Sequence, residues 1–174
     1  MKIGPYQVHT LETGRFALDG GAMFGVIPKT LWSRKHPADA LNRIELALRI
    51  LLLVGDDRVI LVDTGIGSKF PDKYAQMYAI DLTVANLEAS LAAHDLSPAD
   101  VTDVVLTHLH FDHAGGATLL RDGLPVPAFP NAVYWTQQRN WDWAQSQNER
   151  DRASYLKENF APLRAQDQLR LLQG

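Results

Sequence analysis

The chain contains, at residues 107–116, the run Thr107-His108-Leu109-His110-Phe111-Asp112-His113-Ala114-Gly115-Gly116. Three imidazoles and one carboxylate, all of them potential metal ligands, fall close together in this run. The residues before it, 101–106, are mostly β-branched and apolar, which predicts a buried strand. The sequence therefore predicts a metal site in the loop where an interior strand ends.

The spacing of the four candidate ligands suggests how they are divided. Alternate side chains of an extended backbone point to the same face, so we expect His108 and His110 to hold one ion together. Asp112 and His113 follow as the chain turns, so we expect them to face a second ion. The two glycines that follow permit a sharp turn and a close approach of the backbone to the ions.

The residue types indicate which metal the site would bind. Neutral imidazole suits zinc, iron, nickel or copper, whereas carboxylate suits harder ions such as manganese. We expect two divalent ions, with zinc as the metal, because a catalytic zinc keeps a position open for water and lowers its pKa to about 7. The alternative is that these are ordinary polar residues at a strand end, and the tight grouping argues against it.

The motif His108-x-His110-x-Asp112-His113 after an apolar strand resembles the signature of the metallo-β-lactamase superfamily. Residues 62–65, Val-Asp-Thr-Gly, are similar to the second common motif of that superfamily. Within the superfamily, the chain resembles the lactonase-like hydrolases, which include quorum-quenching enzymes that degrade N-acyl-homoserine lactones. This narrower resemblance rests on three short segments: Gly20–Gly25, Asn42–Arg43 and Tyr134–Trp135.

The resemblance implies an α+β fold, the αββα sandwich of the superfamily. The family supplies its remaining ligands later in the chain, as a third histidine for the first ion, a bridging aspartate and a last histidine. No histidine follows His113 here. We therefore expect residues 1–174 to form a single domain truncated at its C-terminus, with much of the second sheet missing and weak metal binding. The inner face of the first sheet would then be exposed. Either the sequence is a truncated form of a longer enzyme, which we favour, or a second copy covers that face in a homodimer.

The resemblance also implies roles for individual residues. Asp63 would lie beneath the metal centre and orient an imidazole, although it can also be read as a turn-forming residue. Asp112 would bind the second ion and pass a proton to the leaving alkoxide. The implied substrate-binding residues are Met23, Phe24 and Phe111. For the first two, core packing is an equally weighted alternative.

The implied function is a metal-dependent hydrolase that uses a metal-activated hydroxide to open an ester bond, with a lactone such as an N-acyl-homoserine lactone as substrate. Alternatives within the same fold are thioester hydrolysis of the glyoxalase II kind, β-lactam hydrolysis and phosphodiester cleavage. The alternative from another class is a non-catalytic, truncated domain that acts as a binding or assembly module. The lack of a secretion signal argues against a β-lactamase, and the shortage of basic residues near the motif argues against a nuclease.

Composition sets broader limits. The 174 residues carry a net charge of -3 and 46% hydrophobic residues, which is typical of one globular domain and argues against nucleic acid as partner. No cysteine is present, so disulfides and thiolate ligands are excluded. The N-terminus lacks the apolar segment of a signal peptide, and the longest apolar run, residues 46–54, is too short to span a membrane. We expect a cytoplasmic protein with a small-molecule ester substrate and no membrane partner.

Hydrophobic periodicity and turn residues predict the remaining elements. We expect strands at residues 6–18, 43–54, 58–62, 101–106, 132–135 and 167–172. We expect helices within residues 70–80, 83–94 (capped by Thr83), 136–145 (capped by Thr136) and 149–160. A return segment at 22–27, a loop at 29–41, a helical turn at 117–120 and an extended loop at 121–131 complete the prediction.

Overall fold

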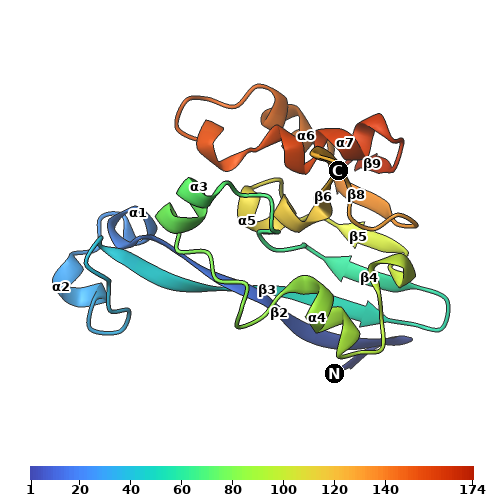
Figure 1. Cartoon of the computed structure of the whole chain (residues 1–174), viewed down its shortest axis with the longest axis horizontal. Helices are drawn as coiled ribbons and strands as arrows, with labels where there is room; N and C mark the ends of the chain where they lie inside the picture. Colours follow the sequence, from blue (N-terminus) through green and yellow to red (C-terminus); the bar gives the residue numbers. More distant parts are fainter.

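The computed structural model describes residues 1–174, and its main feature is a seven-stranded sheet of order β1-β2-β3-β4-β5-β8-β9 (Figure 1). Strands β1 to β4 are antiparallel to their neighbours, whereas β4, β5, β8 and β9 run parallel. The strands of this sheet are Lys2–Ile3 (β1), Tyr6–Asp19 (β2), Arg43–Val54 (β3), Val59–Val62 (β4), Asp103–Val105 (β5), Val133–Gln137 (β8) and Leu169–Leu172 (β9). A hairpin of β6 (Thr118–Arg121) and β7 (Leu124–Pro127) forms a second, two-stranded sheet. The predicted α+β class is confirmed.

Short helices pack around the sheet. They are α1 (Gly20–Phe24), α2 (Lys29–Trp32), α3 (Asp72–Met77), α4 (Leu87–Ala92), α5 (Phe111–Ala114), α6 (Gln138–Gln145) and α7 (Ala161–Ala165). The 3₁₀ helices are Pro98–Asp100, Gly115–Ala117, Arg152–Ser154 and Lys157–Asn159. Helix α4 lies against β2, α6 and α7 lie near β8 and β9, and α1 and α2 sit at the far end of the β2–β3 hairpin (Figure 1). None of these helices has the length and apolar character needed to cross a membrane.

The larger hydrophobic core joins the middle of the sheet to four helices, α4, α5, α6 and α7. Its 19 buried residues include Leu52, Leu61 and Val104 of the central strands, Leu91 of α4 and Leu163 of α7. The central strands are therefore held by side chains from elements far apart in the sequence, which gives the strand ends a fixed position.

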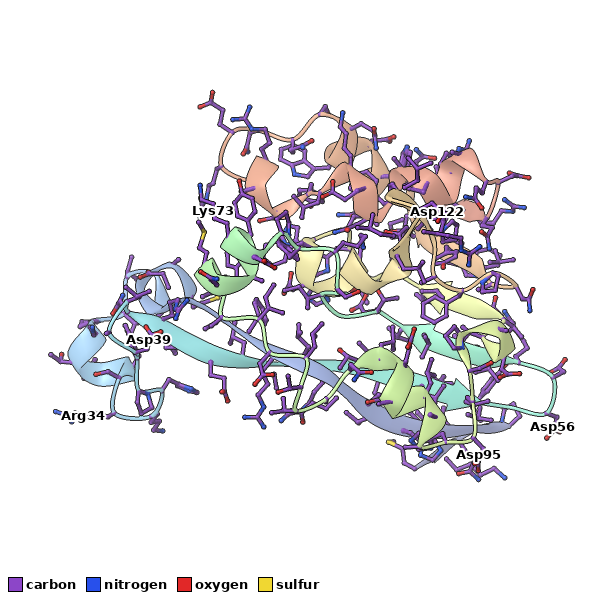
Figure 2. The ribbon with its side chains drawn as sticks, viewed as in Figure 1. Arg34, Asp39, Asp56, Lys73, Asp95 and Asp122 are labelled. Atoms are coloured by element: carbon purple, nitrogen blue, oxygen red, sulfur yellow. The ribbon has the colours of Figure 1, made fainter.

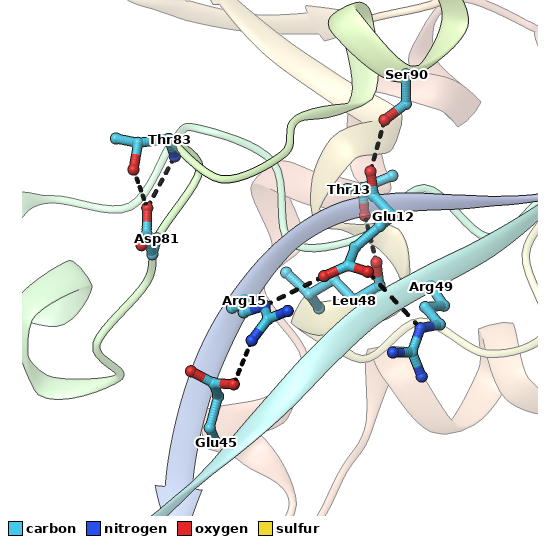
Figure 3. Close-up of polar contacts among 9 residues, drawn as sticks. All are labelled: Glu12, Thr13, Arg15, Glu45, Leu48, Arg49, Asp81, Thr83 and Ser90. Carbon is cyan, nitrogen blue, oxygen red and sulfur yellow. Dashed lines mark hydrogen bonds and ion pairs between the residues drawn. The ribbon is translucent and has the colours of Figure 1, made fainter. Parts of the chain in front are cut away.

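The long β2–β3 hairpin contains a bulge between Glu12 and Arg15. Gly14 lies within it at φ +136°, a conformation that glycine adopts without steric cost. Figure 3 shows that Arg15 pairs with Glu12 and, at 2.6 Å, with Glu45 of β3. These ion pairs are partly exposed and contribute little stability. Ser90 of α4 donates to the Glu12 carbonyl at 2.6 Å, so the bulge is also where α4 attaches to the sheet.

Charged side chains lie at the two ends of the hairpin. Figure 2 shows Asp56, in the β3–β4 turn, and Asp95, after α4, at one end of the molecule. Arg34 and Asp39, between α2 and β3, lie at the other end. The turns between the strands are thus solvated, as their composition predicts.

Two helix starts differ from the sequence prediction. Helix α4 begins after Asn86, whose side chain accepts from the Ala89 amide at 2.9 Å, and not after Thr83. The amide and hydroxyl of Thr83 instead bond to Asp81, at 2.8 and 2.6 Å, and this local turn competes with the helix. Thr136 likewise belongs to β8, and α6 starts after it.

In three other segments the structure differs from the sequence prediction. Within residues 22–27, predicted as a return segment, the first half belongs to α1, which Asp19 caps by accepting from the Ala22 amide at 2.8 Å. Residues 118–127, predicted as a helical turn and an extended loop, form the β6–β7 hairpin, because the Asp122-Gly123 turn has positive φ at both residues and matches strand twist. Residues 149–160 form two 3₁₀ helices, not one α-helix.

Candidate metal centre

The candidate site lies at one edge of the parallel strands. Because β4, β5 and β8 run parallel, their carboxyl ends meet at the same edge, where α/β proteins bind their ligands. Asp63 follows β4 there, and the histidine-bearing loop follows β5. Asn140 of α6 accepts a hydrogen bond from the Leu109 amide at 2.9 Å, so the element after β8 fixes this loop. The Thr64 amide and hydroxyl both donate to the His113 carbonyl, at 2.8 Å each.

Asp63 connects the strand end to one of the candidate ligands. Its carboxylate accepts from the Thr107 amide at 2.8 Å, from the Thr107 hydroxyl and from His113 Nδ1 at 2.8 Å. A carboxylate only accepts, so Nδ1 carries a proton, and in the neutral imidazole Nε2 keeps its lone pair for a ligand. Asp63 is 9% exposed and has φ +64°, a left-handed conformation that is uncommon for a non-glycine residue and often occurs at functional sites.

The four predicted ligands lie close together. The ring centroids of His108 and His113 are 4.0 Å apart, and those of His108 and His110 are 4.5 Å apart. The Asp112 carboxylate lies 3.5 Å from Nε2 of His113. No group of three such side chains is placed to hold one ion, although the His108 ring lies close to both other imidazole rings. Imidazole and carboxylate donors with one ring already oriented by a carboxylate fit a divalent metal in their chemistry.

The local environment shifts the pKa values of the three histidines in different directions. Burial lowers the pKa of His108, and the neighbouring His113 and His110 lower it further. Burial also lowers the pKa of His110. Burial opposes the charge on His113, but its hydrogen bond to Asp63 and the negative charge of Asp112 outweigh burial and raise its pKa. His108 and His110 are therefore held in the neutral form that metal binding requires.

The turn after the ligands packs tightly on the loop after β4. A Cβ on Gly115 would overlap the Ile66 carbonyl oxygen, and a Cβ on Gly116 would overlap that of Thr64. Both glycines are required here by this close approach of two backbones, whereas the sequence had suggested a close approach of the backbone to the ions.

The predicted substrate-binding residues lie in different places. Phe111 is buried, and its ring centroid lies 5.5 Å from that of Phe70 and 5.2 Å from that of Tyr78. Met23 and Phe24 belong to α1, where Met23 is half-exposed and Phe24 stacks on Trp32 at 5.0 Å. The structure thus brings Phe111 next to the ligands and places the other two at the end of the β2–β3 hairpin (Figure 1).

Several residues at the site were not predicted from the sequence. Thr107 donates to Asp63 and lies 3.1 Å from His108 Nδ1, and its place beside the motif was the only local signal for it. The buried Tyr155 packs its ring 4.6 Å from that of His110. Asn140 and Tyr155 lie far along the chain from the motif, and nothing in their own sequence context indicates a role.

Three comparisons with known proteins bear on this site. The family model described as Metallo-beta-lactamase superfamily matches residues 49–170, which is more than half of the chain. N-acyl homoserine lactonase AiiB of Rhizobium rhizogenes is 30% identical over 118 residues, covering 63% of this chain and 42% of the relative. The crystal structure of a probable metal-dependent hydrolase from Staphylococcus aureus is 34% identical, with a TM-score of 0.87, and the match covers 99% of this chain and 61% of that one.

A third solved structure shares the fold at lower identity. It is AidC, described as a dizinc quorum-quenching lactonase in complex with a product, with 23% identity and a TM-score of 0.71. The match covers 99% of this chain and 60% of that one. The chain therefore spans less than two thirds of the length of each of these relatives.

Proposed function

We propose that this chain, which belongs to the metallo-beta-lactamase superfamily, forms a single domain carrying part of the active site of a metal-dependent hydrolase that opens an ester bond. The substrate we propose is a lactone, such as an N-acyl-homoserine lactone. Relatives named as N-acyl homoserine lactonases and the dizinc lactonase with the same fold support this choice.

The observation that carries the proposal is the bond between Asp63 and His113. It fixes the tautomer of one imidazole beside two others and beside Asp112. A purely structural histidine at a strand end has no need of a strained, buried carboxylate that sets its tautomer. The arrangement therefore favours a site that uses the free ring nitrogen.

Each side chain has a proposed task. We assign His108 and His110 to one divalent ion and Asp112 and His113 to the other, with zinc as the metal. Bound divalent ions supply a lowered pKa for water and polarisation of the ester carbonyl. Asp112 passes a proton to the leaving alkoxide, and Asp63 keeps His113 in its orientation.

The apolar part of the substrate requires its own surface. A cavity of about 290 Å³ lies beside Phe111, with Phe70 and Tyr78 in its wall and in contact with the Phe111 ring. We propose this region for the acyl group, and we retain Met23 and Phe24 as further wall residues on the strength of the family resemblance.

A substitution of His110 tests this function. In the full-length protein, His110→Gln should reduce lactone hydrolysis by at least about 1,000-fold, because it removes one of the two ligands assigned to the first ion. The matched control is His94→Gln, since His94 packs on His9 near the end of α4 and touches none of the candidate ligands. Lactone hydrolysis retained by His110→Gln would refute the assignment, and preferred turnover of a thioester, β-lactam or phosphodiester would replace the substrate class.

A non-catalytic binding or assembly module is the second candidate. It is favoured by the observation that no group of three of these side chains is placed to hold one ion. Absence of hydrolysis of every substrate class by the full-length protein, together with zinc binding below one equivalent, would support this second function.

A further inference from the structure

Lys69, in the loop after β4, is a partly buried cation beside the candidate centre. Its ammonium donates to the Thr118 carbonyl at 2.7 Å and to the Gly115 carbonyl. Burial lowers the pKa of Lys69 to about 8, although the charge of Glu158 acts in the opposite direction. An ammonium has three N–H donors, and the two carbonyls use only two of them.

The cavity beside Phe111 is lined by this lysine and by apolar groups. Its aromatic and aliphatic lining comprises Ile66, Phe70, Pro71, Tyr74, Tyr78, Ala153 and Leu156. The polar residues that line the same cavity are Lys69, Glu158 and Asn159. Asn159 is 2% exposed, and its amide nitrogen has no hydrogen-bond partner.

The cavity therefore holds more hydrogen-bond donors than the protein satisfies. A buried donor without an acceptor lowers stability, and a partly buried cation carries a desolvation cost of its own. Glu158 is the nearby acidic group, but it is exposed and acts on Lys69 through its charge rather than by a hydrogen bond. An oxygen atom carried into the cavity by a ligand would satisfy the remaining donor.

We propose that Lys69 is a specificity-determining residue that donates a hydrogen bond to an oxygen on the apolar part of the ligand. The cavity then selects apolar chains or rings that bear a carbonyl oxygen over plain hydrocarbons of the same shape. This inference rests on the proposed function, because that function places the acyl group of the substrate in this cavity.

A purely structural role for Lys69 makes a different prediction. If the ammonium only ties the Gly115 and Thr118 carbonyls together, its loss lowers stability but leaves the ratio of affinities for two ligands unchanged. The ratio of affinities for a ketone and its hydrocarbon analogue therefore separates the two roles.

The test compares butyrophenone with butylbenzene, which differ by one carbonyl in place of a methylene. Binding is measured by NMR titration of the unsubstituted protein, with the ring signals of Tyr74 and Tyr78 locating the ligand in the cavity. We expect butyrophenone to bind about tenfold more tightly, because a hydrogen bond to a charged donor has that effect. Equal affinities would overturn the proposal, and this comparison needs no variant that might fail to fold.

Two variants sharpen the test. Lys69→Met should abolish the preference for the ketone while leaving the affinity for butylbenzene unchanged, and a retained preference would overturn the proposal. The matched control Glu158→Gln keeps Lys69 and should keep the preference. Neither measurement involves hydrolysis, so a protein that prefers the ketone but opens no lactone would contradict the proposed function and not the role of Lys69.

Discussion

Asp63 and Asp103 are two buried carboxylates at opposite ends of the parallel strands. Asp103 begins β5, is 5% exposed and accepts from Arg58 at 2.6 Å and from Trp135 Nε1 at 2.9 Å. Asp63 follows β4 and accepts from Thr107 and from an imidazole. Both satisfy the requirement that a buried carboxylate be hydrogen-bonded.

The difference lies in what their donors do next. The Arg58 guanidinium and the Trp135 indole donate to Asp103 and lead to no candidate ligand. This network only ties together the neighbouring strands β4, β5 and β8. The His113 imidazole has a second nitrogen, 3.5 Å from the Asp112 carboxylate, so the network at Asp63 continues into the candidate ligands. The two hydrogen-bonded carboxylates thus differ in whether their donor has another atom that is free to bind a ligand.

The largest expected effect comes from breaking the packing at the Asp63 end. Gly115→Ala would place a methyl group on the Ile66 carbonyl, and because both sides are backbone, neither yields cheaply. We expect the free energy of unfolding to fall by about 3 kcal/mol. The control is Gly123→Ala in the β6–β7 turn, where an added Cβ would meet no atom within 4 Å. Its free energy of unfolding should fall by only about 1 kcal/mol, because alanine is strained at the positive φ of this residue. Urea unfolding measures both, and equal losses would contradict the tight contact.

Asp63→Asn should separate function from stability. Asparagine tolerates the left-handed conformation at this position, so we expect the free energy of unfolding to change by less than about 1 kcal/mol. The affinity for zinc should fall about 10- to 100-fold, because the variant no longer fixes the tautomer of His113. Competition with a zinc chelator measures the affinity, and an unchanged value would show that Asp63 does not act through the histidine.

Asp103→Asn should lower the stability of the fold without changing its affinity for zinc. An asparagine side chain accepts more weakly from Arg58 and leaves the partly buried Trp135 N–H with a poorer acceptor. We expect a loss of about 1–2 kcal/mol in the free energy of unfolding and no change in zinc affinity. If zinc affinity fell as far as in Asp63→Asn, the two carboxylates would not differ in role.

The smallest expected effect is a pH dependence of the contribution that Asp103 makes to the free energy of unfolding. Burial acts to raise the pKa of Asp103, but hydrogen bonds from Arg58, Thr102 and Trp135 outweigh it and leave the pKa below its ordinary value. A depressed carboxyl pKa stabilises the fold above the unfolded-state value of about 3.9, and this stability is lost as pH falls through the folded-state pKa. The stability gap between the unsubstituted protein and Asp103→Asn should therefore narrow below about pH 4. A gap that stays constant in urea unfolding at pH 7, 4 and 3 would contradict this sign.

The same comparison shows what the sequence could and could not predict. His108, His110, Asp112 and His113 were predictable because all four lie in one short motif after a strand. Asp63 was predictable through the family resemblance of its own motif. The Asp103 network was not, because Asp103 looked like one polar residue in an apolar strand and its partner Arg58 is 45 residues away.

Secondary structure was predictable where local signals agreed with packing. The β3 and β4 strands and their turn have the predicted positions, because apolar runs and turn residues coincide there. The segment 149–160 was not, because contacts with distant residues decide its course: Tyr155 turns to His110, and the Glu158 carbonyl accepts from Thr118 at 2.8 Å. Lys69 was missed for the same reason, since both of its acceptors lie beyond the metal-binding motif.

The most direct test of the central claim is the tautomer of His113, read from the ¹⁵N shifts of its ring by NMR at a pH above its raised pKa, where the imidazole is neutral. If Asp63 orients this imidazole for a ligand, the proton resides on Nδ1, and added zinc shifts the Nε2 signal of His113 together with signals of His108 and His110. A proton on Nε2 with Nδ1 free, or ring signals that do not respond to zinc, would contradict the account.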